Sequence, residues 1–234
     1  MNFFELLNIS PGVTAVIGSG GKTSLLRRLA AEAPGTVLLC TTTHIRPFAE
    51  YPLLTDAAAE TVLQALTSER ILCVGTPCEN GKLTAPRLPM ETLAALADYM
   101  LVEADGSRQM PLKAHAAHEP VIPACAEQVI CVAGASGFDR PIRACVHRPE
   151  RFCALTGAAE TDTVAPLLAA QAILAEGLCD TVFLNQVDNA ELLGRVMPFL
   201  RTAAAGAFLR QRGVCKEIGE SGFSAHCRDC SAIL

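Results

Sequence analysis

The stretch that decides the fold is Val16-Ile17-Gly18-Ser19-Gly20-Gly21-Lys22-Thr23-Ser24, which ends one apolar run and opens a leucine-rich one. The apolar run 13–17 predicts a buried strand, and the leucine spacing along 24–33 predicts a helix. Glycines let backbone N–H groups turn inward around phosphate oxygens, and a helix N-terminus adds partial positive charge. We therefore predict a phosphate loop in which Lys22 reaches the outer phosphates and the Thr23 hydroxyl binds Mg²⁺.

The loop is shorter than the usual phosphate loop, which has a glycine, four residues and then Gly-Lys-Ser/Thr. That spacing needs a glycine at position 16, where this chain has Val16. The compact form resembles the loop of Mur-type ATP-dependent ligases. The alternative is a glycine turn beside a solvated lysine. The residues expected to hold a nucleotide are those of the loop and of the first helical turn: Gly18, Ser19, Gly20, Gly21, Lys22, Thr23 and Ser24.

Two carboxylates, Glu103 and Asp105, follow the apolar run 99–102. Open α/β sheets bind ligands at the carboxyl ends of their strands, and residues two apart on a continuing strand share a face. Either carboxylate is therefore a candidate Mg²⁺ ligand beside Thr23, and the other would orient a nucleophile. Together with Lys22 they form the predicted catalytic set. The alternative is a solvated turn, since Asp-Gly is a common turn pair.

The segment Phe183-Leu184-Asn185-Gln186-Val187-Asp188 resembles the Asn-Lys-x-Asp signature that ends a strand in GTP-binding proteins, with Gln186 in place of the lysine. That resemblance implies that Asn185 braces the loop and that Asp188 contacts the base. The alternative is that Asp188 caps a helix over 190–201. The sequence leaves the choice between ATP and GTP open.

A polar segment, Thr41-Thr42-Thr43-His44-Ile45-Arg46, follows the apolar run 36–40. Its hydroxyls, imidazole and guanidinium are candidates to line a phosphate or Mg²⁺ site, and His44 is the histidine that we favour for a functional role. The alternative is a capping and turn segment.

Apolar runs alternate with helical stretches along the chain. Short continuous apolar runs suit strands buried on both faces, and their alternation with helices predicts an α/β fold. We expect a doubly wound, mostly parallel sheet with helices on both faces, as in P-loop NTPases. The expected strands are 13–17, 36–40, 71–74, 99–102, 128–132 and 181–184, and the expected helices are 24–33, 55–68, 91–97, 163–175 and 190–201.

The chain has 234 residues and a hydrophobic fraction of 50%, which predicts one such domain over 1–234 with 215–234 as a candidate C-terminal appendage. The net charge of −5 argues against a nucleic-acid partner. No apolar run reaches the roughly 18 residues of a membrane span, and the N-terminus lacks a signal-peptide pattern. A membrane partner is therefore not expected.

Eleven cysteines in a chain without an export signal predict reduced thiols and a cytoplasmic location. Those in apolar surroundings are expected to be buried, namely Cys40, Cys73, Cys131 and Cys179. The tail carries Cys215, His226, Cys227 and Cys230, which form a candidate zinc or selenium/sulfur site or an unremarkable tail.

These motifs occur in an order that resembles the YqeC family, described as accessory proteins of selenium-dependent molybdenum hydroxylases. The resemblance is carried by 18–24, 41–45, Glu103 to Pro123, the block His147-Arg148-Pro149-Glu150, and 185–188. It implies a cytoplasmic nucleotide-binding protein that helps to mature such enzymes. A molybdenum hydroxylase or a molybdenum cofactor would then be its partner. The anion contacts suggested by the family blocks are Arg108, Lys113, Arg140 and Arg148.

Three functions follow from these motifs. The first is an NTPase that uses ATP or GTP with Mg²⁺, in which positioning and electrostatics do most of the work. The second is ligase-like activation of a carboxylate by ATP. The third is a nucleotide-sensing chaperone that delivers a cofactor without turnover.

Overall fold

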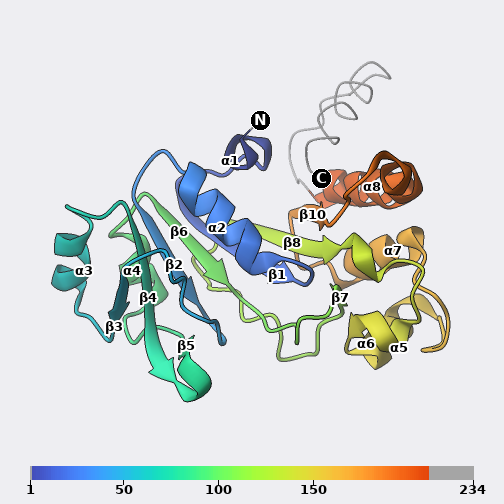
Figure 1. Cartoon of the computed structure of the whole chain (residues 1–234), viewed down its shortest axis with the longest axis horizontal. Coiled ribbons are helices and arrows are strands. Elements are labelled where there is room, and N and C mark those ends of the chain that lie inside the picture. Colours follow the sequence, from blue (N-terminus) through green and yellow to red (C-terminus); the bar gives the residue numbers. More distant parts are fainter. Residues whose placement is uncertain (1, 211–234) are drawn as a thin grey trace.

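A computed structural model of the protein describes residues 2–210, and its main sheet has eight strands (Figure 1). Seven of them lie in the order β10-β8-β1-β6-β2-β4-β3 with parallel neighbours, and β5 pairs antiparallel with β4. The strands are β1 (Gly12–Gly18), β2 (Val37–Thr41), β3 (Leu53–Thr55), β4 (Ile71–Cys78), β5 (Lys82–Thr84), β6 (Tyr99–Glu103), β8 (Gln128–Gly134) and β10 (Thr181–Asn185). A second, small parallel sheet pairs β7 (Leu112–Lys113) with β9 (Val146–His147).

Helices cover both faces of the main sheet, as the alternation of elements predicts. They are α1 (Phe3–Leu6), α2 (Lys22–Glu32), α3 (Ala59–Ala65), α4 (Met90–Ala94), α5 (Ile142–Cys145), α6 (Pro149–Thr156), α7 (Pro166–Glu176) and α8 (Ala190–Arg210). Helix α2 packs on β1 and β6, while α7 and α8 pack against each other beside β10 (Figure 1). The predicted doubly wound α/β class is confirmed.

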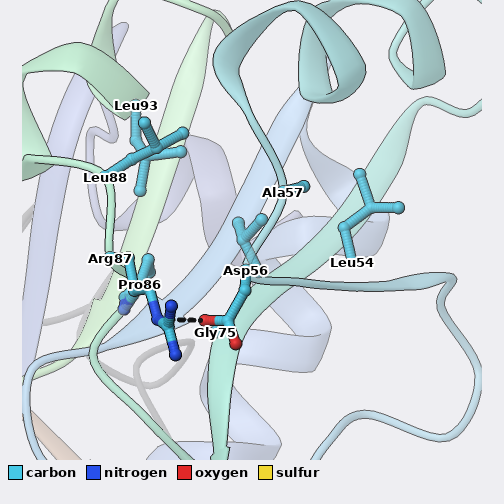
Figure 2. Close-up of a pocket in the computed structure, with 9 residues that line it drawn as sticks. Leu54, Asp56, Ala57, Gly75, Pro86, Arg87, Leu88 and Leu93 are labelled. Atoms are coloured by element: carbon cyan, nitrogen blue, oxygen red, sulfur yellow. Dashed lines mark ion pairs between the residues drawn. The ribbon is translucent and has the colours of Figure 1, made fainter.

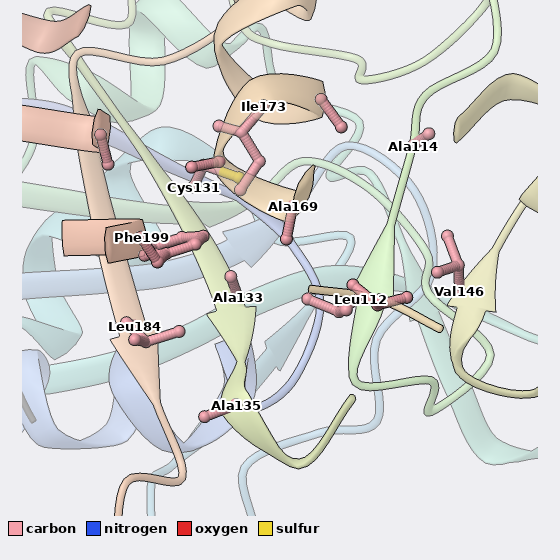
Figure 3. Packing of buried hydrophobic residues seen from close by; sticks show 14 of the residues in the cluster. Leu112, Ala114, Cys131, Ala133, Ala135, Val146, Ala169, Ile173, Leu184 and Phe199 are labelled. Carbon is pink, nitrogen blue, oxygen red and sulfur yellow. The ribbon is translucent and has the colours of Figure 1, made fainter. Parts of the chain in front are cut away.

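The core divides according to the alternation of side chains along the strands. Val16 of β1 packs into one apolar cluster with α1 and α2. Its neighbour Ile17 points to the opposite face and joins a second cluster with α7 and α8. In that second cluster Phe199 of α8 lies close to Ala133 and Leu184 (Figure 3). A third cluster places α3 and α4 against the other half of the same face. Each strand of the sheet's centre is therefore buried on both sides.

Strand β1 occupies the point where the strand order reverses. The chain leaves β1 for β2 on one side, returns to β6 next to β1, and then continues to β8 on the other side of β1. In open α/β sheets, ligand crevices form at such a point, beyond the carboxyl ends of the strands. The fold therefore places the glycine loop, which follows β1, at the favoured position.

Two predicted helices differ from the structure at their N-terminal ends. The stretch 55–68 is not one helix, because Leu53–Thr55 forms β3 beside β4 and Asp56 turns the chain with φ 50. The predicted helix 163–175 begins only at Pro166, since Thr163 pairs with Pro141 in an isolated bridge. Tertiary pairing outweighs helix propensity at both places.

Among residues 2–210, no helix is long and apolar enough to cross a membrane. Three of the four cysteines expected in the core, Cys40, Cys73 and Cys131, are buried, and Cys179 is half-buried. The segment 215–234, with its candidate metal site of Cys215, His226, Cys227 and Cys230, lies outside the described residues.

Candidate functional site

The glycine loop connects the end of β1 to the start of α2 and packs tightly against two distant segments. Gly20 and Gly21 have φ values of 90 and 129, which L side chains rarely adopt. A Cβ on Gly20 would lie 2.5 Å from the Gly134 Cα and 2.7 Å from the Pro111 oxygen. The loop thus needs glycine here both for its turn and for close backbone packing.

Ser19 is engaged inside the protein rather than left open for a ligand. Its N–H donates to the Val132 oxygen at 2.8 Å, and its hydroxyl donates to the Met110 oxygen. In this structure both polar groups that Ser19 would offer to a phosphate already have partners. The N–H groups of the first turn of α2, at Lys22, Thr23 and Ser24, have no intrahelical acceptor and remain as potential phosphate donors.

Lys22 lies at the start of α2, with a side chain that is only 5% exposed. Its Nζ donates to the Gly18 oxygen at 2.7 Å and lies 2.8 Å from Oδ1 of Asp105. The Lys22 ammonium is therefore held beside the loop by the Gly18 carbonyl and the Asp105 carboxylate.

Asp105 is the centre of a buried ionic network and has no exposed surface. Its Oδ2 accepts the Gly18 N–H at 2.9 Å and lies 3.1 Å from Lys113 Nζ and 2.8 Å from His115 Nε2. Burial alone would raise the pKa of this carboxyl, but the His115 hydrogen bond and the two lysines outweigh it and hold the pKa at about 2. Asp105 is therefore an ionised structural anchor for the loop.

Glu103, the second carboxylate, has a different environment. Its Oε2 accepts a hydrogen bond from the Thr23 hydroxyl at 3.2 Å. Burial raises the pKa of Glu103, and the nearby charge of Asp105 adds to the shift, while Lys22 opposes it. The two carboxylates predicted as interchangeable are thus distinct, because Asp105 is saturated by cations and Glu103 faces a hydroxyl.

Two residues of this network, His115 and Glu176, were not among the sequence-based candidates. His115 places its Nδ1 2.8 Å from Glu176 Oε2 and its Nε2 against Asp105. His44, the histidine favoured from sequence, is exposed on the segment after β2. The only sequence signal for His115 is its i, i+2 spacing from Lys113 in an extended stretch, and nothing local distinguishes Glu176.

Of the four predicted anion contacts, two form ion pairs with carboxylates and two lie on the surface. Lys113 Nζ lies 2.7 Å from Glu119 Oε2, in addition to Asp105, and Arg148 forms a bidentate pair with Glu119. These contacts, with burial opposing them, lower the pKa of Glu119 to about 2. Lys113 and Arg148 are therefore neutralised by carboxylates in this structure. The remaining two guanidiniums, those of Arg108 and Arg140, are exposed.

The end of β10 meets the glycine loop through one side chain. Asn185 Nδ2 donates to the Gly20 oxygen at 2.9 Å across 165 residues of sequence. Gln186 accepts from the Ser136 hydroxyl at 2.6 Å, and Asp188 is exposed. The alternative reading of Asp188 as a helix cap is wrong, because Asn189 Oδ1 accepts the Leu192 N–H at the start of α8.

The threonines at and just beyond the end of β2 support the neighbouring end of β6. The Thr41 hydroxyl donates to the Glu103 carbonyl oxygen at 2.7 Å, and the Thr43 N–H donates to Thr41 Oγ1 at 3.0 Å. His44 and Arg46 are exposed. The observed contacts are those of the capping and turn alternative.

A separate hollow lies at the β3 and β4 edge of the sheet (Figure 2). Its lining includes Leu54, Leu88 and Leu93, and an ion pair of 3.1 Å joins Arg87 to Asp56, two further lining residues. Strands β2 and β6 separate this edge from β1, so the hollow is not part of the glycine-loop site.

The fold and the site together define a doubly wound α/β protein with a P-loop-like turn after its central strand. The chain belongs to the YqeC family, because the family model described as YqeC protein matches residues 14–150. A relative from Escherichia coli (strain K12), described as the uncharacterized protein YqeC, is 38% identical over 159 residues. The match covers 63% of this chain and 61% of the relative, so the chain spans about three fifths of that protein's length. No solved structure matches.

Proposed function

We propose that this protein binds a nucleoside triphosphate with Mg²⁺ at the glycine loop and hydrolyses it. One observation carries the proposal: Lys22 and Thr23, consecutive at the start of α2, each face a carboxylate at the end of β6. Lys22 Nζ lies 2.8 Å from Asp105, and the Thr23 hydroxyl lies 3.2 Å from Glu103. A lysine, a hydroxyl and a strand-end acid around a glycine loop are the groups that phosphoryl transfer to water requires.

The residues present fit Mg²⁺ at Thr23 and Glu103. A hydroxyl and a carboxylate are the oxygen donors that Mg²⁺ uses, together with waters and substrate phosphates. Burial raises the pKa of Glu103, and a divalent cation bound beside it would favour the ionised carboxylate. Asp105 fits less well as a direct ligand, since Lys22, Lys113 and His115 surround its oxygens.

The protein groups would then divide the work as follows. The N–H groups at the start of α2 and the Lys22 ammonium bind the phosphate oxygens and stabilise the charge that spreads over them in the transition state. Thr23 and Glu103 would hold the cation, which would supply positive charge to the phosphates. Asn185 fixes the Gly20 backbone, so the loop keeps the shape that presents these donors.

The biological role that we propose is the one that the family resemblance implies: assistance in the maturation of selenium-dependent molybdenum hydroxylases. The nucleotide site would supply an energy-dependent or nucleotide-sensing step in that process. The partner would be the hydroxylase or its molybdenum cofactor.

The test is titration of the wild type and of Lys22→Ala with labelled ATP and GTP, with and without Mg²⁺, followed by assay of phosphate release. We expect saturable, Mg²⁺-dependent binding in the wild type and a loss of about 100-fold or more in Lys22→Ala. Arg87→Ala, which removes an exposed cation at the β3 and β4 edge of the sheet, is the matched control.

Equal behaviour of the wild type and Lys22→Ala toward both nucleotides would overturn the proposal. Binding without phosphate release, or release only with a client hydroxylase, would replace hydrolysis by nucleotide sensing. Formation of a hydroxamate from a carboxylate substrate and ATP would instead favour ligase-like activation.

A further inference from the structure

We propose that His115 and Glu176 are positioning residues that hold Asp105, and through it Gly18 and Lys22, in the geometry that binds phosphate. The inference rests on the proposed function and extends it to two side chains that do not reach the glycine loop themselves. The path runs from the last residue of α7, through the segment after β7, to the carboxylate beyond β6.

The hydrogen-bond geometry places His115 between two carboxylates. Both ring nitrogens lie 2.8 Å from carboxylate oxygens, Nδ1 from Glu176 and Nε2 from Asp105. Because an ionised carboxylate only accepts hydrogen bonds, an imidazolium with a proton on each nitrogen can donate to both. His115 is therefore placed to join the two carboxylates.

Glu176 is placed where a helix disfavours a negative charge. It is the last residue of α7, and the C-terminal end of a helix carries partial negative charge. Its side chain is also only 8% exposed. His115 offsets this unfavourable placement of the Glu176 carboxylate. Its backbone N–H donates to Oε1 at 2.5 Å, and its Nδ1 lies 2.8 Å from Oε2. The Glu176 carboxylate therefore contacts both the backbone and the ring of His115.

These two contacts orient the imidazole ring so that Nε2 of His115 faces Asp105. The same Asp105 oxygen that meets Nε2 also accepts the Gly18 N–H at 2.9 Å, and the other oxygen holds Lys22. The remaining charged groups around this centre are Lys113, which contacts Asp105, and Glu103, Glu119, Arg148 and Arg151 beyond it. Removing Glu176 would free the imidazole, and Asp105 would then be held by the two lysines and the Gly18 N–H.

The experiment compares Glu176→Gln with the wild type, using fluorescent ATP and GTP in the presence of Mg²⁺ and thermal unfolding followed by circular dichroism. Glutamine keeps the size of the side chain and an acceptor for the His115 N–H, but removes the charge that keeps His115 protonated. We expect the Kd for the preferred nucleotide to rise by about tenfold, measured well below the unfolding midpoint. Glu160→Gln, at an exposed position, is the matched control and should leave the Kd unchanged.

A purely structural role would lower the unfolding midpoint without changing the Kd of the folded protein, and that result would overturn the inference. If Glu176→Gln does not fold, His115→Gln serves in its place with the same expectation. Lys22→Ala measured in the same series separates the two proposals. A loss of binding in Lys22→Ala with a normal Kd in Glu176→Gln removes this inference only, whereas no nucleotide binding by the wild type removes the proposed function.

Discussion

Among the strand ends that contact the glycine loop, those of β6 and β10 differ most in burial and charge. The end of β6 contributes Asp105, which has no exposed surface and meets Gly18, Lys22, Lys113 and His115. The end of β10 contributes a single hydrogen bond from Asn185 to Gly20, and three residues later Asp188 lies in solvent.

The difference separates a charge on which the fold depends from a charge on which it does not. A buried charge is tolerated only when its partners are all present, so every change at the β6 end should affect the whole domain. An exposed carboxylate such as Asp188 has little energetic link to the fold and is free to meet a ligand. The predictions below test this contrast, beginning with the largest expected effect.

Replacing Asp105 by Asn should destabilise the protein most, by about 3–5 kcal/mol, because two buried lysines and an imidazolium lose their shared anion. The measurement is the free energy of unfolding from denaturant titration at neutral pH. Asp188→Asn makes the same chemical change at an exposed position and serves as the control. Equal unfolding free energies for the two variants would show that the buried Asp105 contributes no more to stability than the exposed Asp188.

Lowering the pH should show the contribution of Asp105 to the stability of the wild-type protein. The pKa of Asp105 is about 2 in the folded protein against an ordinary value of 3.8, so its stabilisation is present above pH 3.8 and is lost as pH falls toward 2. The loss should reach about 2 kcal/mol over this range, measured as the denaturant midpoint at a series of pH values.

Glu119, whose pKa is also about 2, adds to the loss in the same direction. In Glu119→Gln the acid loss should therefore shrink without disappearing. A midpoint that stays constant from pH 4 to pH 2 in the wild type would show that Asp105 is not stabilised as the contacts indicate.

Asn185→Ala should have an intermediate effect, limited to the loop. Loss of one hydrogen bond to the Gly20 oxygen should weaken nucleotide binding by about fivefold, equivalent to about 1 kcal/mol. Asn189→Ala provides the matched control, since it removes the cap of α8 but no contact with the loop. If Asn189→Ala weakens nucleotide binding as much as Asn185→Ala, the hydrogen bond from Asn185 to Gly20 has no specific role in binding.

Asp188→Asn should have the smallest effect on stability, within about 0.5 kcal/mol of the wild type. If Asp188 contacts the base, its effect will be on the ratio of the Kd values for GTP and ATP, which is the quantity to measure. Glu191→Gln, three residues further on, is the control. An unchanged ratio would exclude Asp188 from base recognition.

Local pattern was enough to predict most of the fold. The strands and helices with continuous apolar runs or leucine spacing begin within a few residues of their predicted starts, although α8 continues to Arg210, well beyond the predicted end at 201. Strand β1 and helix α2 flank the glycine loop as expected. The short elements β3, β5, β7 and β9 were not predicted, because strands of two or three residues exist only through their partners. The same reason explains the error at 55–58, where pairing with β4 replaces the first turns of the predicted helix.

The sequence by itself determined the glycine loop, its lysine and threonine, and the acids that follow β6, because each is encoded by neighbouring residues with a conformational or chemical requirement. Only the tertiary structure decided that Asp105 is an anchor and that Glu103 faces Thr23. It also brought Lys113, His115 and Glu176 into the network, and turned Lys113 and Arg148 toward carboxylates instead of a ligand. The physical reason is that charge pairing depends on distance and burial, which bring together residues as far apart in the chain as Lys22 and Asp105 and leave no periodic trace in the sequence.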